Sequence, residues 1–147
     1  MTSIQIRALF YSAAVFNWCA VVLLFPPTGL ARLVGLMPLA GNGLFDQIAL
    51  LAIFGFGIGY ALVAYDPPRN RGVVVLGAVL KLGVVAIIYA HYLLGDANVR
   101  MAFLVSGDLI YAALFLQYLR TSRSDRGLMD HLRESGTNST STRQASN

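Results

Sequence analysis

Charged residues are scarce in this sequence of 147 residues. They make up 12% of it, and lysine occurs only once, as Lys81. Hydrophobic residues make up 56%, and the mean hydropathy is +0.63. A soluble domain of this size needs a more polar surface, so the composition excludes that class and indicates an integral membrane protein.

Cysteine and histidine are also rare. Cys19 is the single cysteine, so it forms no disulfide within the chain, and we expect it to serve helix packing. His91 is the only histidine in an apolar run, which excludes a haem held by two histidines of one chain. Because no cluster of His, Cys or carboxylate residues has metal-site spacing, we predict no metal and no cofactor.

Four apolar runs stand out against this background. Each has roughly 18 to 22 residues, which is the length that a helix needs to cross a hydrocarbon core of about 30 Å. The sequence therefore predicts an all-α, integral membrane four-helix bundle in residues 1–120, with spans at about 8–25, 45–65, 73–94 and 101–119. Residues 121–147 are too polar to bury a core and are expected to form a disordered cytoplasmic tail.

The arginines predict how the chain is oriented. Most of them flank the spans on one side, and only two lie on the other side, at Arg32 and Arg100. Because basic residues collect on the cytoplasmic side, both the N and C termini are predicted to be cytoplasmic, in the inner membrane of a bacterium. The net charge of +4 is thus a topology signal, and no nucleic-acid partner is predicted. The arginines on the cytoplasmic side are Arg7, Arg69, Arg71, Arg120, Arg123, Arg126, Arg133 and Arg143.

The connections between the spans are of three kinds. The first, residues 26–43, is long and still apolar, and it predicts either a short helix in the membrane interface or an ordered loop that caps the bundle. The second is a tight cytoplasmic turn in which Asp66 precedes two prolines and Arg69 and Arg71 anchor the turn at the phosphate level. The third, "GDANV", forces a hairpin, beside which Asp96 and Arg100 are expected to form an exposed ion pair.

Glycines in two spans predict close helix packing. Gly55, Gly57 and Gly59 follow one another in "FGFGIGY", and Gly77 lies one turn before Lys81. Small residues at such spacings let a neighbouring helix approach closely, which is how helices associate in lipid. The glycine run opens no phosphate-binding turn, so it is not a nucleotide motif.

Lys81 lies too deep in its span to reach water alone. Its backbone is about 12 Å from the cytoplasmic boundary, while Asn17 and Tyr111 lie about 13 Å deep and Asp108 about 18 Å deep. A polar cluster of Lys81, Asp108, Tyr111 and Asn17 follows if these faces point inward. It is either a buried ion pair that fixes the register of two helices or a pocket for a ligand headgroup or proton.

Two stretches resemble a known group of proteins. "FGFGIGYALVAYDPPRNRGVVVLGAVLKLG" and "SGDLIYAALFLQYL" are similar to patterns in small uncharacterised bacterial membrane proteins of the DoxX-like, four-helix kind, over residues 45–120. The resemblance implies a compact four-helix membrane bundle and transfers no catalytic residue. It also implies that Tyr60, Asp66, Lys81 and Asp108 belong to one framework.

Three classes of function remain open at this point. An accessory or assembly component of a membrane complex suits a small chain with packing glycines and no reaction motif. A carrier or binding protein for a lipid-like or quinone-like molecule would use the polar cluster, and a membrane-embedded enzyme is the third class. The predicted partners are the lipid bilayer and other membrane proteins or a second copy of the chain.

Overall fold

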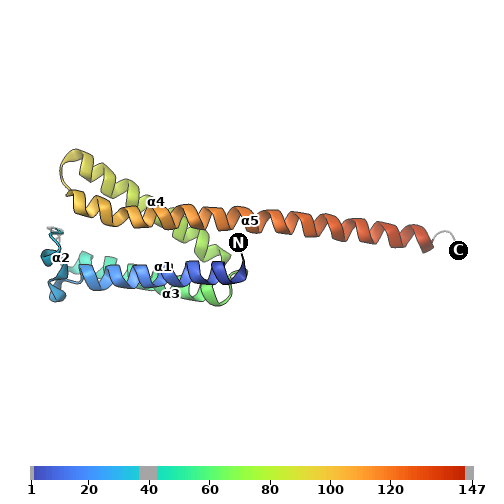
Figure 1. Ribbon diagram of the computed structural model, residues 1–147, viewed down its shortest axis with the longest axis horizontal. Coiled ribbons are helices and arrows are strands. Elements are labelled where there is room, and N and C mark those ends of the chain that lie inside the picture. The colour runs from blue at the N-terminus through green and yellow to red at the C-terminus, as the bar shows by residue number, and fades with distance from the viewer. Residues whose placement is uncertain (1, 37–42, 145–147) are drawn as a thin grey trace.

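The computed structural model describes residues 2–36 and 43–144, and within these ranges it describes side chains as far as Ser122. Every regular element in them is helical, which confirms the all-α prediction (Figure 1). The elements are α1 (Ser3–Leu24), the 3-10 helix η1 (Pro26–Thr28), α2 (Leu30–Leu33), α3 (Gly43–Tyr65), α4 (Arg71–Leu94) and α5 (Val99–Gln144).

Four helical segments are long and apolar enough to cross a membrane: α1, α3, α4 and the part of α5 from Val99 to Ser122. They contain 22 to 24 residues, which corresponds to about 33 to 36 Å of helix. The second and third predicted spans agree with α3 and α4 to within two residues. The first helix begins earlier than predicted, because Thr2 and Gln5 form a reciprocal capping box at its start.

The helices are arranged as two hairpins. α1 packs antiparallel to α3, and α4 packs antiparallel to α5, so most close backbone contacts between elements lie within these pairs (Figure 1). Gly95, with φ of 87°, ends α4. The side chain of Asn98 then accepts a hydrogen bond from the Met101 N–H at 2.9 Å and starts α5. The short "GDANV" turn therefore forms the predicted hairpin.

An aromatic core joins the hairpins at the end of the bundle that holds the N-terminus. Phe10 of α1 lies 5.1 Å from Phe115 and 5.3 Å from Tyr118, measured between ring centroids. Tyr60 of α3 lies 5.1 Å from Phe115. These rings are almost completely buried, and Val63 and Val74 fill the space beside them. Contact between the hairpins at this end is therefore made by side chains of all four long helices.

The described part of the connection after α1 is partly helical, and its predicted place in the membrane interface stays a prediction. η1 ends at Gly29, with φ of 66°, and α2 is capped by Val34, which Gly35 follows with φ of 68°. Hydrogen bonds also tie the connection to the start of α5. The Asn98 side chain donates to the Gly35 carbonyl, and Arg100 donates to the Val34 carbonyl, both at 3.1 Å. Residues 37–42 lie outside the described part of the chain.

α5 is longer than the predicted fourth span. It continues without a break to Gln144 and projects beyond the bundle, so the predicted boundary at residue 120 falls inside a helix (Figure 1). Side-chain contacts beyond Ser122 lie outside what the structure describes. The predicted disorder of residues 121–147 therefore stays a prediction.

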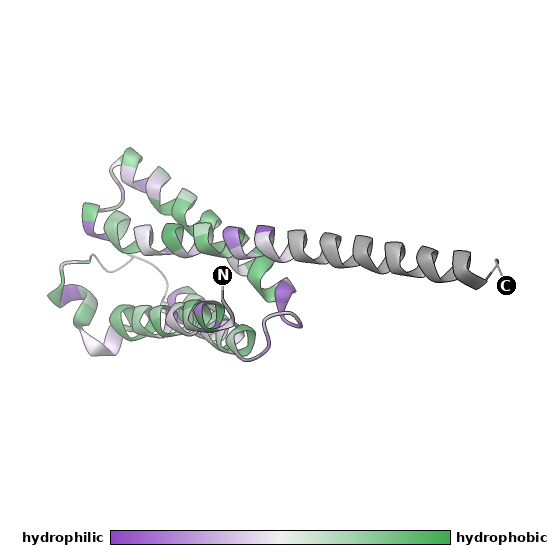
Figure 2. Cartoon of the chain, turned by 45° about the vertical axis from the view of Figure 1, so that its right-hand side comes forward, coloured by the Kyte–Doolittle hydropathy of each residue, from purple (hydrophilic) through white to green (hydrophobic). Residues whose placement is uncertain are grey.

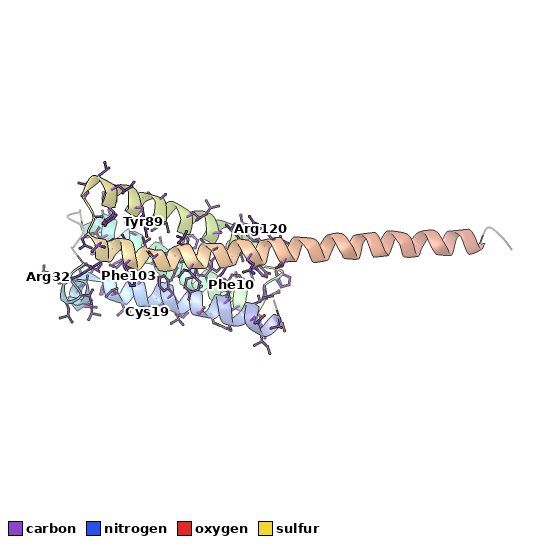
Figure 3. The ribbon with its side chains drawn as sticks, turned by 45° about the horizontal axis from the view of Figure 1, so that its top comes forward. Phe10, Cys19, Arg32, Tyr89, Phe103 and Arg120 are labelled. Atoms are coloured by element: carbon purple, nitrogen blue, oxygen red, sulfur yellow. The ribbon has the colours of Figure 1, made fainter. Side chains whose placement is uncertain are left out.

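Large apolar side chains cover the outside of the helices. Phe103 and Leu93 are each 82% exposed, whereas hydrophilic residues collect at the connections (Figure 2). Cys19, which we expected to serve packing, lies exposed on α1 instead (Figure 3). Such an extensive apolar surface is far larger than soluble monomers expose.

Candidate functional site

Lys81 is buried at the centre of the bundle, with 5% of its surface exposed. Its Nζ forms an ion pair with Asp108 Oδ1 of α5 and donates a hydrogen bond to Asn17 Oδ1 of α1 at 3.1 Å. Four residues were predicted to form the polar cluster, and polar contacts join three of them in the structure. We call Lys81, Asp108 and Asn17 the Lys81 cluster.

Asn17 connects this cluster to α3. Its side-chain amide accepts from Lys81 through Oδ1 and donates through Nδ2 to the Ile53 carbonyl at 3.2 Å. The neighbouring Trp18 donates in the same way to the Phe54 carbonyl at 3.4 Å. Asn17, which is 6% exposed, therefore holds its amide in one orientation and presents the oxygen to the ammonium.

Three aromatic rings surround the Lys81 ammonium. The distances from Nζ to the ring centroids are 5.4 Å for Phe16, 5.5 Å for Tyr60 and 5.6 Å for Tyr111. At this range the electron-rich ring faces attract a cation. Tyr111 thus joins the cluster through its ring. Sequence reasoning missed Phe16, because neighbouring residues on a helix point in directions about 100° apart and only packing shows which one faces the lysine.

Lys81 and Asp108 form an ion pair although the sequence predicted them at different depths in the membrane. Lys81 and Asp108 differ in predicted depth by about 6 Å when the helices are taken as parallel. α4 crosses α5 obliquely and the two separate toward the Gly95 turn (Figure 1). This inclination, together with the length of the lysine side chain, lets the two groups meet.

The predicted packing glycines have different surroundings. A Cβ at Gly77 would meet Tyr60 Oη at 2.6 Å, and one at Gly59 would meet Val73 Cγ1 at 3.1 Å. A Cβ at Gly57 would overlap the Trp18 ring. Gly55 is exposed, with open space around it in the described chain, so its packing role stays a prediction.

The turn between α3 and α4 uses its two arginines differently. Asp66 Oδ1 accepts a hydrogen bond from the Arg69 N–H at 3.3 Å, which closes the turn. The side chain of Arg71 points to α5 and donates to the carbonyls of Leu119 at 2.8 Å and Ser122 at 3.5 Å. Arg71 therefore anchors the turn to α5, and anchoring of the two arginines at the phosphate level stays a prediction.

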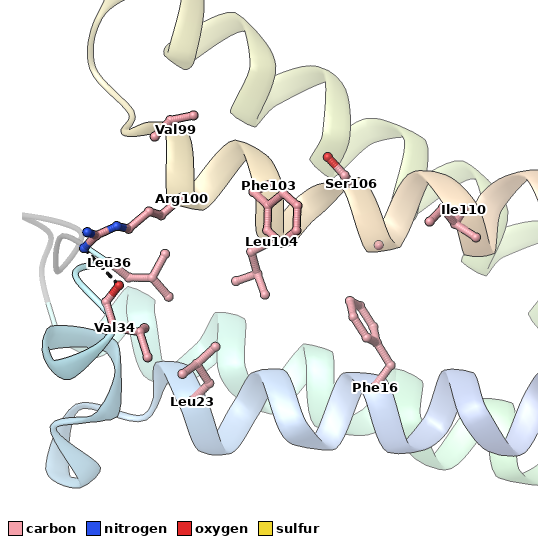
Figure 4. A pocket seen from close by; sticks show the side chains of 11 residues that line it. Phe16, Leu23, Val34, Leu36, Val99, Arg100, Phe103, Leu104, Ser106 and Ile110 are labelled. Carbon is pink, nitrogen blue, oxygen red and sulfur yellow. Dashed lines mark hydrogen bonds between the residues drawn. The ribbon is translucent and has the colours of Figure 1, made fainter.

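A cavity of about 790 Å³ lies between α1 and α5, beside the Lys81 cluster (Figure 4). Phe16 stands between the two, since its ring lies near the ammonium and also lines the cavity. The rest of the lining is apolar except for Ser106 and Arg100: Leu23, Val34, Leu36, Val99, Phe103, Leu104, Gly107 and Ile110. A second hollow of about 530 Å³ lies between α1 and α3 at the same end of the bundle.

The expected ion pair between Asp96 and Arg100 does not form. Asp96 Oδ2 lies 3.3 Å from His91 Nδ1 instead, because the α4 end places both on the same turn. The Arg100 guanidinium points to the connection after α1 and donates to the Val34 carbonyl. That prediction was wrong, and Arg100 lies at the edge of the cavity (Figure 4).

The chemistry available at the cluster is limited. Throughout the described side chains, no buried nitrogen or oxygen lacks a hydrogen-bond partner. Within the same residues, no group of three or more His, Cys, Asp or Glu side chains could hold a metal ion. Within the Lys81 cluster the ammonium is paired with Asp108 and Asn17 of the same chain, and the Asp108 side chain keeps 21% of its surface exposed.

Comparison with models of protein families, with curated proteins and with solved structures finds no match to this chain. The resemblance to DoxX-like proteins therefore stays a prediction.

Proposed function

We propose that the chain is a multi-pass protein of the bacterial inner membrane, with four spans and both termini in the cytoplasm. Four helices of spanning length and the large exposed apolar surface support insertion. The arginine distribution supports the orientation, because Arg69 and Arg71 lie at the turn between α3 and α4, at the same end of the bundle as the N-terminus.

A reporter enzyme that works only outside the cytoplasm tests this orientation. Fusion after Leu119, where the proposed fourth span ends, should give an inactive phosphatase, and fusion within residues 96–98 should give an active one. An active phosphatase after Leu119 would overturn the proposed topology.

Within the membrane, we propose that the protein acts as an accessory or assembly component of a larger complex. The observation that carries this proposal is that groups of the same chain pair the buried Lys81 ammonium. Its ammonium is matched by a carboxylate, an amide and three rings of the same chain. A buried charge that is fully paired serves as an internal brace between helices, and it leaves the exposed helix faces for other membrane proteins.

Native electrophoresis at ordinary expression level, in mild detergent, tests this role. The expected result is a complex well above the mass of one 15.9 kDa chain, with the same second membrane protein present in a fixed ratio. A chain that migrates alone, or with copies of itself only, would contradict the accessory role.

A second candidate function is binding or carriage of a lipid-like or quinone-like molecule. The observation that favours it is the cavity between α1 and α5, which has about 790 Å³ and falls within the range of about 300 to 1,000 Å³ for small-molecule sites. Extraction of the purified protein followed by mass spectrometry tests this function. A retained amphiphile in molar proportion to the chain supports it, and its absence after mild purification contradicts it.

A further inference from the structure

Arg100 lies at the edge of the cavity without an acidic partner in the described chain. The ion pairs formed there join Lys81 to Asp108 and His91 to Asp96. Arg100 Nη1 donates to one neutral acceptor, the Val34 carbonyl, at 3.1 Å. The guanidinium also packs on Gly35. It has five N–H donors, and this single bond uses one of them.

The cavity beside Arg100 has the shape of a site for a hydrocarbon chain. Its lining follows α5 from Val99 to Ile110, which is a length of about 16 Å. At the far end the Phe16 ring packs on Gly107, where an added Cβ would meet Phe16 Cζ at 2.7 Å. A chain that enters at Arg100 would therefore run along α5 toward Phe16 and Ile110, at the other end of the lining (Figure 4).

Arg100 is also placed at the level where lipid headgroups would lie. It is the second residue of α5, at the end of the spanning segment Val99–Ser122. A lipid phosphate is anionic and accepts two parallel hydrogen bonds from one guanidinium.

We propose that this cavity binds one acyl chain of an anionic phospholipid, with the lipid phosphate held by Arg100. The second acyl chain would lie outside, along the exposed ring of Phe103, which is at the cavity edge. A quinone head has no charge to match the guanidinium, and a partner's apolar helix would cover it without pairing it. This inference rests on the second candidate function, and it names the ligand class.

Native mass spectrometry of the full-length protein in detergent tests the proposal, with phosphatidylglycerol and diacylglycerol of identical acyl chains as probes, since diacylglycerol lacks the phosphate. We expect phosphatidylglycerol to bind more tightly, on the order of fivefold for one arginine at the membrane surface. Arg100→Gln should bring the two affinities together. Arg32→Gln is the matched control, because Arg32 is an exposed arginine of the same end of the bundle that does not line the cavity.

A second variant tests the cavity itself. Leu104→Trp fills the space between α1 and α5 and should weaken the binding of both lipids severalfold, while Arg100→Gln removes only the preference between them. Thermal unfolding of each variant shows that it is folded, and Ile110→Phe replaces Leu104→Trp if that variant unfolds.

Three outcomes would overturn the inference. The first is equal affinity of the original chain for both probes, and the second is an Arg32→Gln effect as large as that of Arg100→Gln. The third is undiminished binding in the filled variants. Equal binding that Leu104→Trp abolishes would overturn the headgroup assignment but keep the second candidate function, whereas binding of neither probe would overturn both.

Discussion

The two ends of the bundle are packed in opposite ways. At the end with the N-terminus, which we call the closed end, Phe10, Tyr60, Phe115 and Tyr118 are buried against one another. At the end with α2, the open end, a hollow of about 790 Å³ lies between the hairpins, and a second of about 530 Å³ lies within the first hairpin, between α1 and α3. The Lys81 cluster lies between them, so charge pairing occurs where the aromatic core stops.

This difference teaches what holds helices together in lipid. Lipid tails are as apolar as leucine, so exposed leucines and valines at the open end gain little by meeting each other. Close packing of rings, fitted glycines and polar bonds supply the attraction. The buried rings are concentrated at the closed end and the Lys81 bonds lie beside them, whereas hydrogen bonds from Asn98 and Arg100 to the connection after α1 join the hairpins at the open end. Substitutions at the two ends should therefore have unequal effects.

The largest loss of stability is expected for substitutions in the Lys81 cluster, which lies between the two ends. Lys81→Met or Asp108→Asn alone leaves the other group without its partner, which should destabilise the fold by roughly 3 to 5 kcal/mol. The double variant removes both charges and should recover most of that loss. Chemical unfolding in detergent measures the cycle. If Lys81→Met were as stable as the original chain, the Lys81 cluster would not act as a brace.

Removing a ring comes next. Phe115→Ala at the closed end should lose about 2 kcal/mol, less than in a soluble protein because lipid lessens the transfer cost and leaves mainly the cavity cost. Phe103→Ala at the open end removes a ring that is 82% exposed and should change stability by no more than about 0.5 kcal/mol. Equal losses in thermal unfolding experiments would erase the distinction between the ends.

A pair of glycines in α4 offers a smaller and sharper contrast. Gly77→Ala should cost about 1 to 2 kcal/mol, since its Cβ would press on the buried Tyr60 ring. Gly83→Ala, in the same helix but with open space around it, should not destabilise the fold. Denaturant unfolding of both variants measures the difference. A neutral Gly77→Ala would mean that Tyr60 moves easily and that this end is less closely packed.

The smallest effect concerns a polar bond at the open end. Tyr89 Oη and Ser106 Oγ lie 3.0 Å apart and link α4 to α5 where the helices separate (Figure 3). Tyr89→Phe should cost about 0.6 kcal/mol, the average for such bonds in membrane proteins. Ser106→Ala should lose a similar amount, and the double variant no more than either. If the double variant lost as much stability as the two single variants together, the bond would contribute nothing.

Much of the fold could be predicted from the sequence because each span is decided locally. Apolar length, turn residues and arginine positions are properties of neighbouring residues, and they placed α3 and α4 to within two residues of their bounds. The start of α1 was misjudged, because capping by Thr2 and Gln5 extends a helix through polar residues.

For the site, the sequence predicted only how deep in the membrane each residue would lie. Residues at one level of a membrane are candidates for contact, and this identified Lys81, Asp108, Asn17 and Tyr111. Depth does not give helix rotation or tilt, so the Phe16 ring, the contact of Arg71 with α5 and the cavity beside Arg100 were not anticipated. Each of them depends on how the two hairpins meet.

The placement of the ion pair also has a consequence for the order of assembly. Lys81 and Asp108 both belong to the hairpin of α4 and α5, which a short turn connects. The hairpin can therefore neutralise its own buried charge as it enters the membrane, before α1 and α3 dock. Asn17 meets an already paired ammonium when the hairpins associate. In the proposed membrane topology, Lys81 would thus contribute both to insertion of the second hairpin and to its association with the first.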